Sequence, residues 1–94
     1  MLTFKAMYQF IDEGVRAEVL DFPGAISFGK DLVAGRRMVG SALVDMAETN
    51  LLLGEPLPRP DPACTNLDAD LQEPSYLILT TASRVTFEPQ GAAP

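Results

Sequence analysis

Residues 2–11 read LTFKAMYQFI, with an apolar side chain at every second position. A period of two is typical of a strand that places one face on a core. Residues 12–14, DEG, interrupt the pattern, and Gly14 can adopt the positive φ that a short hairpin loop needs. Residues 15–22 resume the alternation, so the segment predicts a β-hairpin whose short loop fixes the register of its strands.

The next stretch, residues 20–29, reads LDFPGAISFG. Pro23 presets φ at the first central position of a turn, and Gly24 supplies positive φ at the next. This combination predicts a type II turn. A short strand over residues 25–28 should follow, and Gly29 should end it.

A helix is expected to begin near Asp31, whose carboxylate can cap exposed N–H groups and interact with the positive end of the helix dipole. Gly54 is the expected stop, with prolines soon after it. Gly35 lies on the apolar stripe and predicts a close approach to the sheet, whereas Arg36-Arg37 indicates a solvated flank. The stripe at helical spacing consists of Leu32, Gly35, Val39, Ala42, Leu43 and Met46.

Residues 54–74 predict an irregular connection that is rich in proline and acid, and long connections of this kind are usually functional or mobile. Residues 75–88 give the strongest strand signal, with a bulge or bend expected at Ala82-Ser83, and residues 89–94 predict a flexible tail. The order β-β-β-α-β over a single domain, residues 1–88, predicts an α+β fold. Its sheet should be rich in antiparallel pairs and carry one helix on one face.

Composition excludes several classes of function. The chain has 94 residues, a formal net charge of −6, one Cys and no His. It therefore lacks a His-based triad, a His metal ligand, an internal disulfide and a Cys-rich zinc site.

The scattered basic residues of the chain argue against a nucleic-acid interface. The acidic surplus suits a basic partner, or simply keeps a small protein soluble. No signal peptide or membrane segment is evident, and the lone Cys favours the cytoplasm.

No group of residues meets the requirements of catalysis, so we expect no enzyme, metal or cofactor. Asp12-Glu13 lies in a predicted turn, where nothing would desolvate it. The spacing Asp68-x-Asp70-x-x-Glu73 does not match a calcium loop. Cys64 has no His to activate it and is interpreted as a bystander thiol.

The run LDFPGAISFG, residues 20–29, resembles the HicB family of antitoxins, in which a strand ends in a hydrophobic-Pro-Gly turn before a short strand to Gly. The family then shows a polar helix start and an Ala-rich amphipathic helix, here residues 30–53. It commonly closes this helix with Gly-x-x-x-Pro, here residues 54–58. The resemblance implies a partial ribonuclease-H-like domain without nuclease activity. It also implies that the partner is a small basic ribonuclease toxin of the HicA-like kind.

Two hypotheses follow. In the first, the protein is a non-enzymatic HicB-like antitoxin that binds its basic partner through the acidic connection, at Asp61, Asp68, Asp70 and Glu73. In the alternative, it is an orphan HicB-like domain that acts as a self-associating structural or ligand-binding module. Its homo-oligomer would form through a sheet edge or face at Leu77, Ile78 and Leu79. With 94 residues, we expect no second, DNA-binding domain and no direct DNA binding.

Overall fold

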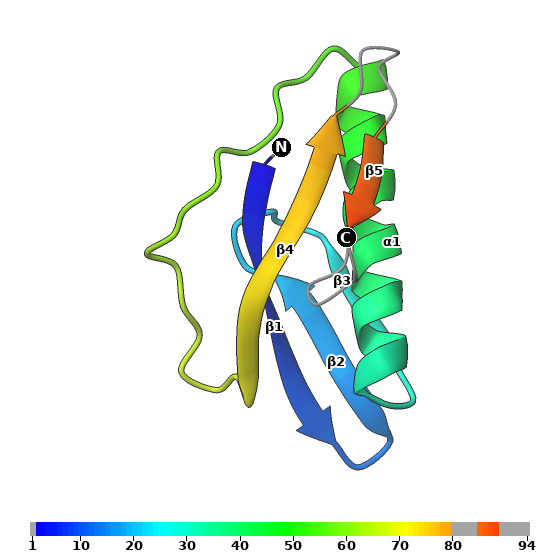
Figure 1. Cartoon of the computed structure of the whole chain (residues 1–94), viewed down its shortest axis with the longest axis vertical. Coiled ribbons are helices and arrows are strands. Elements are labelled where there is room, and N and C mark those ends of the chain that lie inside the picture. Colours follow the sequence, from blue (N-terminus) through cyan, green and yellow to red (C-terminus); the bar gives the residue numbers. More distant parts are fainter. Residues whose placement is uncertain (1, 80–84, 89–94) are drawn as a thin grey trace.

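A computed structural model describes residues 2–79 and 85–88, which form an antiparallel sheet with one helix against it (Figure 1). The sheet is five-stranded, in the order β3-β2-β1-β4-β5, and each neighbouring pair is antiparallel. This arrangement confirms the predicted α+β class. In chain order the elements are β1 (Leu2–Ile11), β2 (Gly14–Val19), β3 (Ile26–Gly29), α1 (Leu32–Leu52), β4 (Leu71–Leu79) and β5 (Val85–Glu88).

The predicted turns are present. Ile11 pairs with Gly14, so the hairpin loop contains only Asp12-Glu13. Gly14 has a φ of 148°, and a Cβ there would collide with the carbonyl oxygen of Gly29. Gly24 has a φ of 93°, and the amide of Ala25 donates to the carbonyl of Phe22 across 3.2 Å, as a type II turn requires.

Both ends of α1 follow the expected capping chemistry. The side chain of Asp31 accepts a hydrogen bond of 2.8 Å from the amide of Ala34. After Leu52 the chain turns through Gly54, whose φ is 71°, and the amide of Glu55 returns to the carbonyl of Asn50. Within the described residues, no helix is both long enough and apolar enough to span a membrane.

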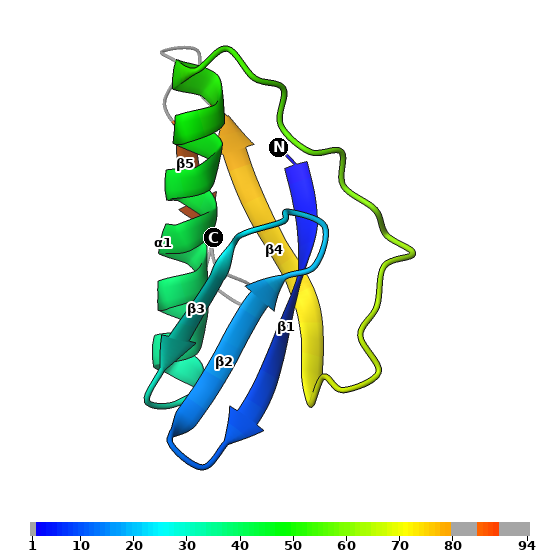
Figure 2. The same cartoon turned by 180° about the vertical axis from the view of Figure 1, so that it is seen from behind.

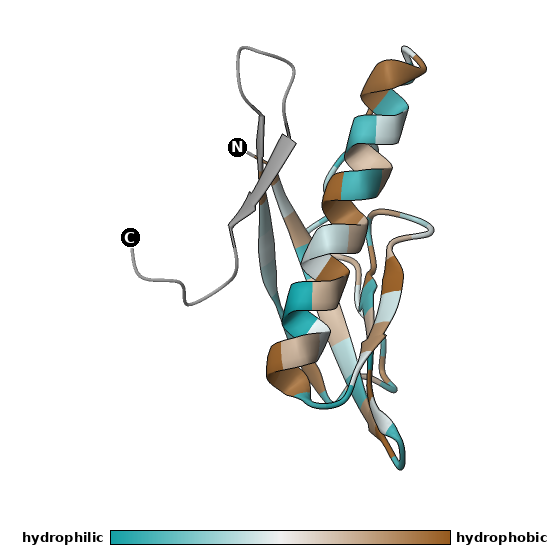
Figure 3. Ribbon diagram, turned by 90° about the vertical axis from the view of Figure 1, so that its right-hand side faces the viewer, coloured by the Kyte–Doolittle hydropathy of each residue, from teal (hydrophilic) through white to brown (hydrophobic). Residues whose placement is uncertain are grey.

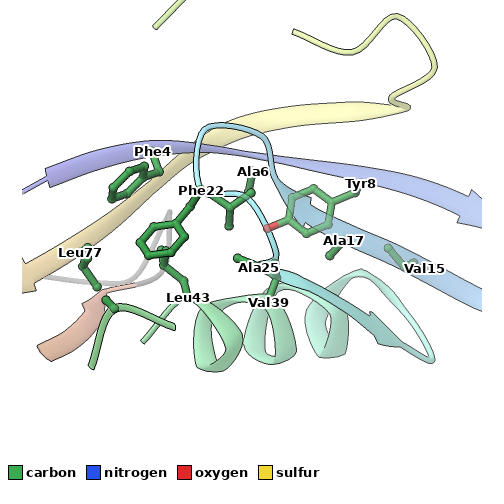
Figure 4. Packing of buried hydrophobic residues seen from close by; sticks show 12 residues of the cluster. Phe4, Ala6, Tyr8, Val15, Ala17, Phe22, Ala25, Val39, Leu43 and Leu77 are labelled. Atoms are coloured by element: carbon green, nitrogen blue, oxygen red, sulfur yellow. The ribbon is translucent and has the colours of Figure 1, made fainter. Parts of the chain in front are cut away.

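The core lies between α1 and one face of the sheet (Figure 4). The rings of Phe4 and Phe22 meet edge to face, with centroids 5.4 Å apart. Gly35 allows the close approach that its place on the stripe predicted, because a Cβ there would lie 3.2 Å from Cγ1 of Val15. The buried cluster consists of Phe4, Ala6, Tyr8, Val15, Ala17, Val19, Phe22, Ala25, Val39, Leu43, Ala47 and Leu77.

Two expectations about the second half of the chain were wrong. Residues 75–88 are not one strand, because 85–88 fold back and pair with 76–79. No Gly or Pro in the sequence marks this reversal, so alternation alone did not reveal it. The bend expected at Ala82-Ser83 and the tail at 89–94 lie outside the described residues.

The irregular connection ends at Asp70 rather than Pro74, because β4 already begins at Leu71. Pro74 is tolerated in this strand because of its partner, Lys5. The amide of Lys5 donates to the Asp21 side chain and its carbonyl accepts from Leu20, so both groups point away from β4. The nitrogen of Pro74 therefore faces away from β1, and no ladder hydrogen bond is lost.

Candidate functional site: an acidic end formed by a clamped loop

The connection between α1 and β4, residues 53–70, crosses the sheet on the face opposite α1. Figures 1 and 2 show it leaving the end of α1 and running the length of the sheet to the start of β4. In the close view, this connection, the sheet and α1 lie in three successive layers (Figure 4). The connection thus carries acidic residues from one end of the sheet to the other.

Asp21 holds the first half of this loop. It is 9% exposed, and its two carboxylate oxygens accept from different segments. Oδ1 accepts from the amide of Lys5 at 2.8 Å, and Oδ2 accepts from the amide of Asp61 at 2.9 Å. The ammonium of Lys5 adds hydrogen bonds to the carbonyls of Pro62, at 3.0 Å, and Cys64, at 2.6 Å. We call Asp21 and Lys5 together the loop clamp.

Sequence reasoning did not identify the loop clamp. Asp21 was part of the run LDFPGAISFG, but no role was assigned to it. The available signal was that Asp21 is a charged residue in a largely apolar segment. Such a segment is expected to be buried, and a buried carboxylate needs hydrogen-bond partners. Which amides it binds could not be predicted, because Asp61 lies forty positions further along the chain.

The second half of the loop is attached to β1. Asp70 donates its amide to the carbonyl of Tyr8 at 2.8 Å, and its Oδ2 accepts from the amide of Phe10 at 2.7 Å. The side-chain amide of Gln9 donates to the carbonyl of Asp68 at 3.3 Å. These contacts place Asp68 and Asp70 beside the end of β1, immediately before the hairpin loop.

The result is a surface that we call the acidic end. The segments that carry its carboxylates also carry exposed apolar side chains: Phe10 is 56% exposed, Ile11 41% and Leu67 96%. A basic residue, Lys30, lies across the hairpin, with its Cα close to Gly14. The acidic end consists of Phe10, Ile11, Asp12, Glu13, Leu67, Asp68 and Asp70.

The four acidic residues proposed from the sequence do not share one surface. Asp68 and Asp70 lie in the acidic end. Asp61 lies further back along the loop, where its Oδ1 accepts from the amide of Ala63 at 3.0 Å. Glu73 is in β4, and its side chain is only 11% exposed. The turn carboxylates Asp12 and Glu13, by contrast, were not expected to lie near the loop.

Glu73 is engaged inside the domain with Arg36 of α1. The guanidinium donates through Nε to Oε1 at 2.8 Å and through Nη2 to Oε2 at 3.0 Å, so the pair is bidentate. This contact corrects the interpretation of Arg36 as part of a solvated flank. The hydrogen bonds that Arg36 donates to Glu73 raise the pKa of the Arg36 guanidinium.

Tyr8 belongs to the same cluster. Burial, followed by the neighbouring carboxylate of Glu73, raises the pKa of the Tyr8 hydroxyl well above its ordinary value of 10.0. A hydroxyl with this pKa stays protonated at neutral pH and is a poor base or nucleophile. The cluster therefore joins helix to sheet.

The loop also forms one wall of a cleft of about 760 Å³ on the sheet face opposite α1. Apolar groups from Leu2, Pro60, Pro62 and Pro74 line it, together with Lys5 and Asp21.

Burial and the carboxylates of Asp21 and Asp61 raise the pKa of the Cys64 thiol beside the loop clamp. Among the residues that the structure describes, no group of three or more His, Cys, Asp or Glu could hold a metal ion.

The expected position of the self-association edge needs correction. Leu77 is fully buried, and β4 is paired with β1 on one side and β5 on the other. Residues 77–79 therefore provide no free edge, and the side chains of Ile78 and Leu79 lie outside what the structure describes. Within the described residues, the outer strands are β3 and β5.

No protein-family model matches the chain, and a search of curated proteins finds no match either. The likeness to HicB antitoxins therefore rests on the sequence motifs alone and stays a prediction.

Proposed function

We propose that this chain is a non-enzymatic, HicB-like antitoxin-type protein that binds a small basic protein through its acidic end. The resemblance implies that this partner is a ribonuclease toxin, and the lone Cys favours the cytoplasm as the place where the complex forms. The observation that carries the proposal is the attachment of the loop to β1. It gathers Asp68 and Asp70, from one part of the chain, beside Asp12 and Glu13, from another.

The acidic end has the chemistry of a docking surface for a basic protein. Protein interfaces typically combine apolar and polar side chains, and here Phe10, Ile11 and Leu67 are exposed in the same segments as the carboxylates. The net charge of −6 would draw a basic protein toward the chain and speed the encounter at low salt. Asp70 has a double role, because it also attaches the loop.

The proposal that the chain is not an enzyme has separate support. Tyr8 and Cys64 both have raised pKa values, which keep the hydroxyl and the thiol protonated at neutral pH. Neither group is activated for nucleophilic attack. The alternative, a self-associating module, is favoured by a different observation at β3, which is developed below.

Co-purification from the source cells with a charge-matched control tests the proposal. The test variant is Asp12→Asn/Glu13→Gln/Asp68→Asn, whose three side chains accept no hydrogen bond from the described residues. The control is Asp45→Asn/Glu48→Gln/Glu55→Gln, which removes the same charge at exposed positions away from the acidic end. Each protein carries the same tag, and mass spectrometry identifies what it retains.

The wild type and the control should both retain one small basic protein, and the test variant should lose it. The identity of the captured protein then tests the family assignment, since the resemblance implies that a neighbouring gene encodes it. Retention of the same proteins by all three forms, or of no small basic protein by any, would contradict the proposal.

A further inference from the structure

The outer strand β3 has an unusual edge. It pairs with β2 on one side, and within the described residues no strand lies on its other side. Its four residues, Ile26–Gly29, carry no charge and no proline, the features that commonly protect a sheet edge. Ile26 is 42% exposed and Phe28 is 58% exposed.

The hydrogen-bonding groups of this edge can be assigned from the sheet register. The amide of Val19 donates to the carbonyl of Ala25 at 2.9 Å, so Ala25 faces β2. Because backbone direction alternates along a strand, Ser27 also faces β2, whereas Ile26 and Phe28 direct their amides and carbonyls outward. The amide of Ile26 already donates to the carbonyl of Gly24. In the part of the chain that the structure describes, nothing pairs with the amide of Phe28 or with the carbonyls of Ile26 and Phe28, so these groups remain for a new strand.

Residues of α1 also lie along the edge of β3. Met46 lies against Gly24, and Ala34 lies against Gly29, so this row of α1 runs along β3. Met38 belongs to the same row by helical spacing and is 43% exposed. Figure 3, coloured by hydropathy, views the molecule with β3 beside α1. Apolar side chains therefore flank the edge on both faces of the sheet.

We propose that β3 pairs antiparallel with β3 of a second copy, about a two-fold axis at Ser27, to form one continuous sheet. In this register Phe28 lies directly opposite Ile26 of the second copy, and the same pair repeats across the axis. The amide of each Phe28 meets the carbonyl of the other copy's Ile26, which gives two hydrogen bonds across the axis, and the carbonyl of Phe28 stays accessible to water. The exposed side chains become cross-strand pairs.

The edge fits a second copy because it is also self-complementary in charge. Arg16 pairs with Phe28 in the register of β2 and β3, and Glu18 pairs with Ile26. The two-fold axis places Arg16 in the same cross-sheet row as Glu18 of the other copy, and the reverse. Like charges are not brought together. The salt bridge between Arg16 and Glu18 within each copy, at 2.9 Å, can stay in place.

Dimerisation should respond to salt in the opposite sense from partner binding. Two copies that each carry −6 repel at long range, so salt should strengthen the dimer. Binding of a basic protein at the acidic end should weaken with salt, because opposite charges attract. The two proposals use different surfaces and can therefore fail independently.

Sedimentation equilibrium over a wide concentration range, at low and high salt, tests the inference. Phe28→Lys keeps the outward amide but places a charge on the edge, whereas Phe28→Pro removes the outward amide together with the ring. Phe10→Lys is the matched control, because Phe10 is 56% exposed on β1, away from the β3 edge. Circular dichroism confirms that each variant is folded.

The wild type and Phe10→Lys should approach twice the 10.1 kDa of one chain as concentration and salt rise. Both Phe28 variants should dimerise at least about tenfold more weakly. A wild type that stays monomeric throughout would overturn the inference and leave the acidic end untouched. Folded Phe28→Lys that dimerises as tightly as the wild type would also overturn it.

Discussion

Removing the Asp21 carboxylate should release the loop from the sheet. Asp21→Ala deletes the acceptors for two backbone amides, at Lys5 and Asp61. The amide of Lys5 lies inside the sheet, between β1 and the end of β2, so water cannot easily replace its partner. The amide of Asp61 lies on the loop, where water can take over once the loop moves.

The magnitude follows from this difference. A hydrogen bond to a charged group contributes about 1.5–3 kcal/mol, and a buried donor left unpaired costs a similar amount. With one donor stranded and one rehydrated, Asp21→Ala should lower the free energy of unfolding by about 2–4 kcal/mol. Domains of this size have a total stability of about 5–14 kcal/mol, so the change is large.

Urea unfolding and thiol labelling provide complementary measurements. Cys64 reports on the loop, because burial and the charge of Asp21 both raise the pKa of its thiol. The substitution removes the charge and release of the loop removes the burial, so Cys64 in Asp21→Ala should react with iodoacetamide several times faster than in the wild type. The control is Asp61→Ala, which loses only the 3.0 Å bond from Ala63 and should cost at most about 1 kcal/mol.

The reasoning about the loop clamp is refuted if Asp21→Ala costs no more than Asp61→Ala and Cys64 reacts at an unchanged rate. Both variants remove one aspartate from the same region, so a difference between them cannot come from net charge.

Three further predictions concern the contacts between α1 and the sheet. Arg36→Met should cost about 2–4 kcal/mol in urea unfolding, because Glu73 loses its partner. Arg36→Met/Glu73→Leu should cost less than the single variant, and a larger cost would argue against the ion pair. Tyr8 has a raised pKa when folded, so its contribution to stability is full below pH 10 and declines at higher pH. Stability of Tyr8→Phe should therefore fall less steeply between pH 9 and 11, and equal slopes would exclude this effect. Gly29→Ala should cost at least about 2 kcal/mol by thermal or urea unfolding, because its Cβ would collide with the backbone of Gly35; a neutral effect would contradict the close packing.

The sequence predicted local structure well where the chemistry is local. Alternation identified β1, and Asp31 and Gly54 marked the ends of α1, because capping depends on a few adjacent residues. The pairing and extent of the strands in the second half of the chain were harder to predict from the sequence. The reversal between β4 and β5 carries no Gly or Pro, and Pro74 suggested a loop although it lies in a strand.

The candidate site shows the same division. Sequence reasoning singled out the acidic residues of the connection, but their environments depend on the tertiary structure. Glu73 turned out to be paired with Arg36, whereas Asp68 and Asp70 lie with the hairpin. Asp21, which fixes the loop, was overlooked because its partners are distant in the chain. Burial decides which carboxylates can meet a partner protein, and the sequence pattern alone does not reveal which side chains are buried.

The most direct test of the proposed function is a binding titration with the small basic protein captured by the chain. Calorimetry would measure its affinity for the wild type, for Asp12→Asn/Glu13→Gln/Asp68→Asn and for the charge-matched control, at about 50 and 300 mM salt. The account predicts that the acidic-end variant binds at least about tenfold more weakly than the other two, and that the wild type loses affinity as salt rises. Equal affinity of all three forms, or an affinity that does not depend on salt, would contradict it.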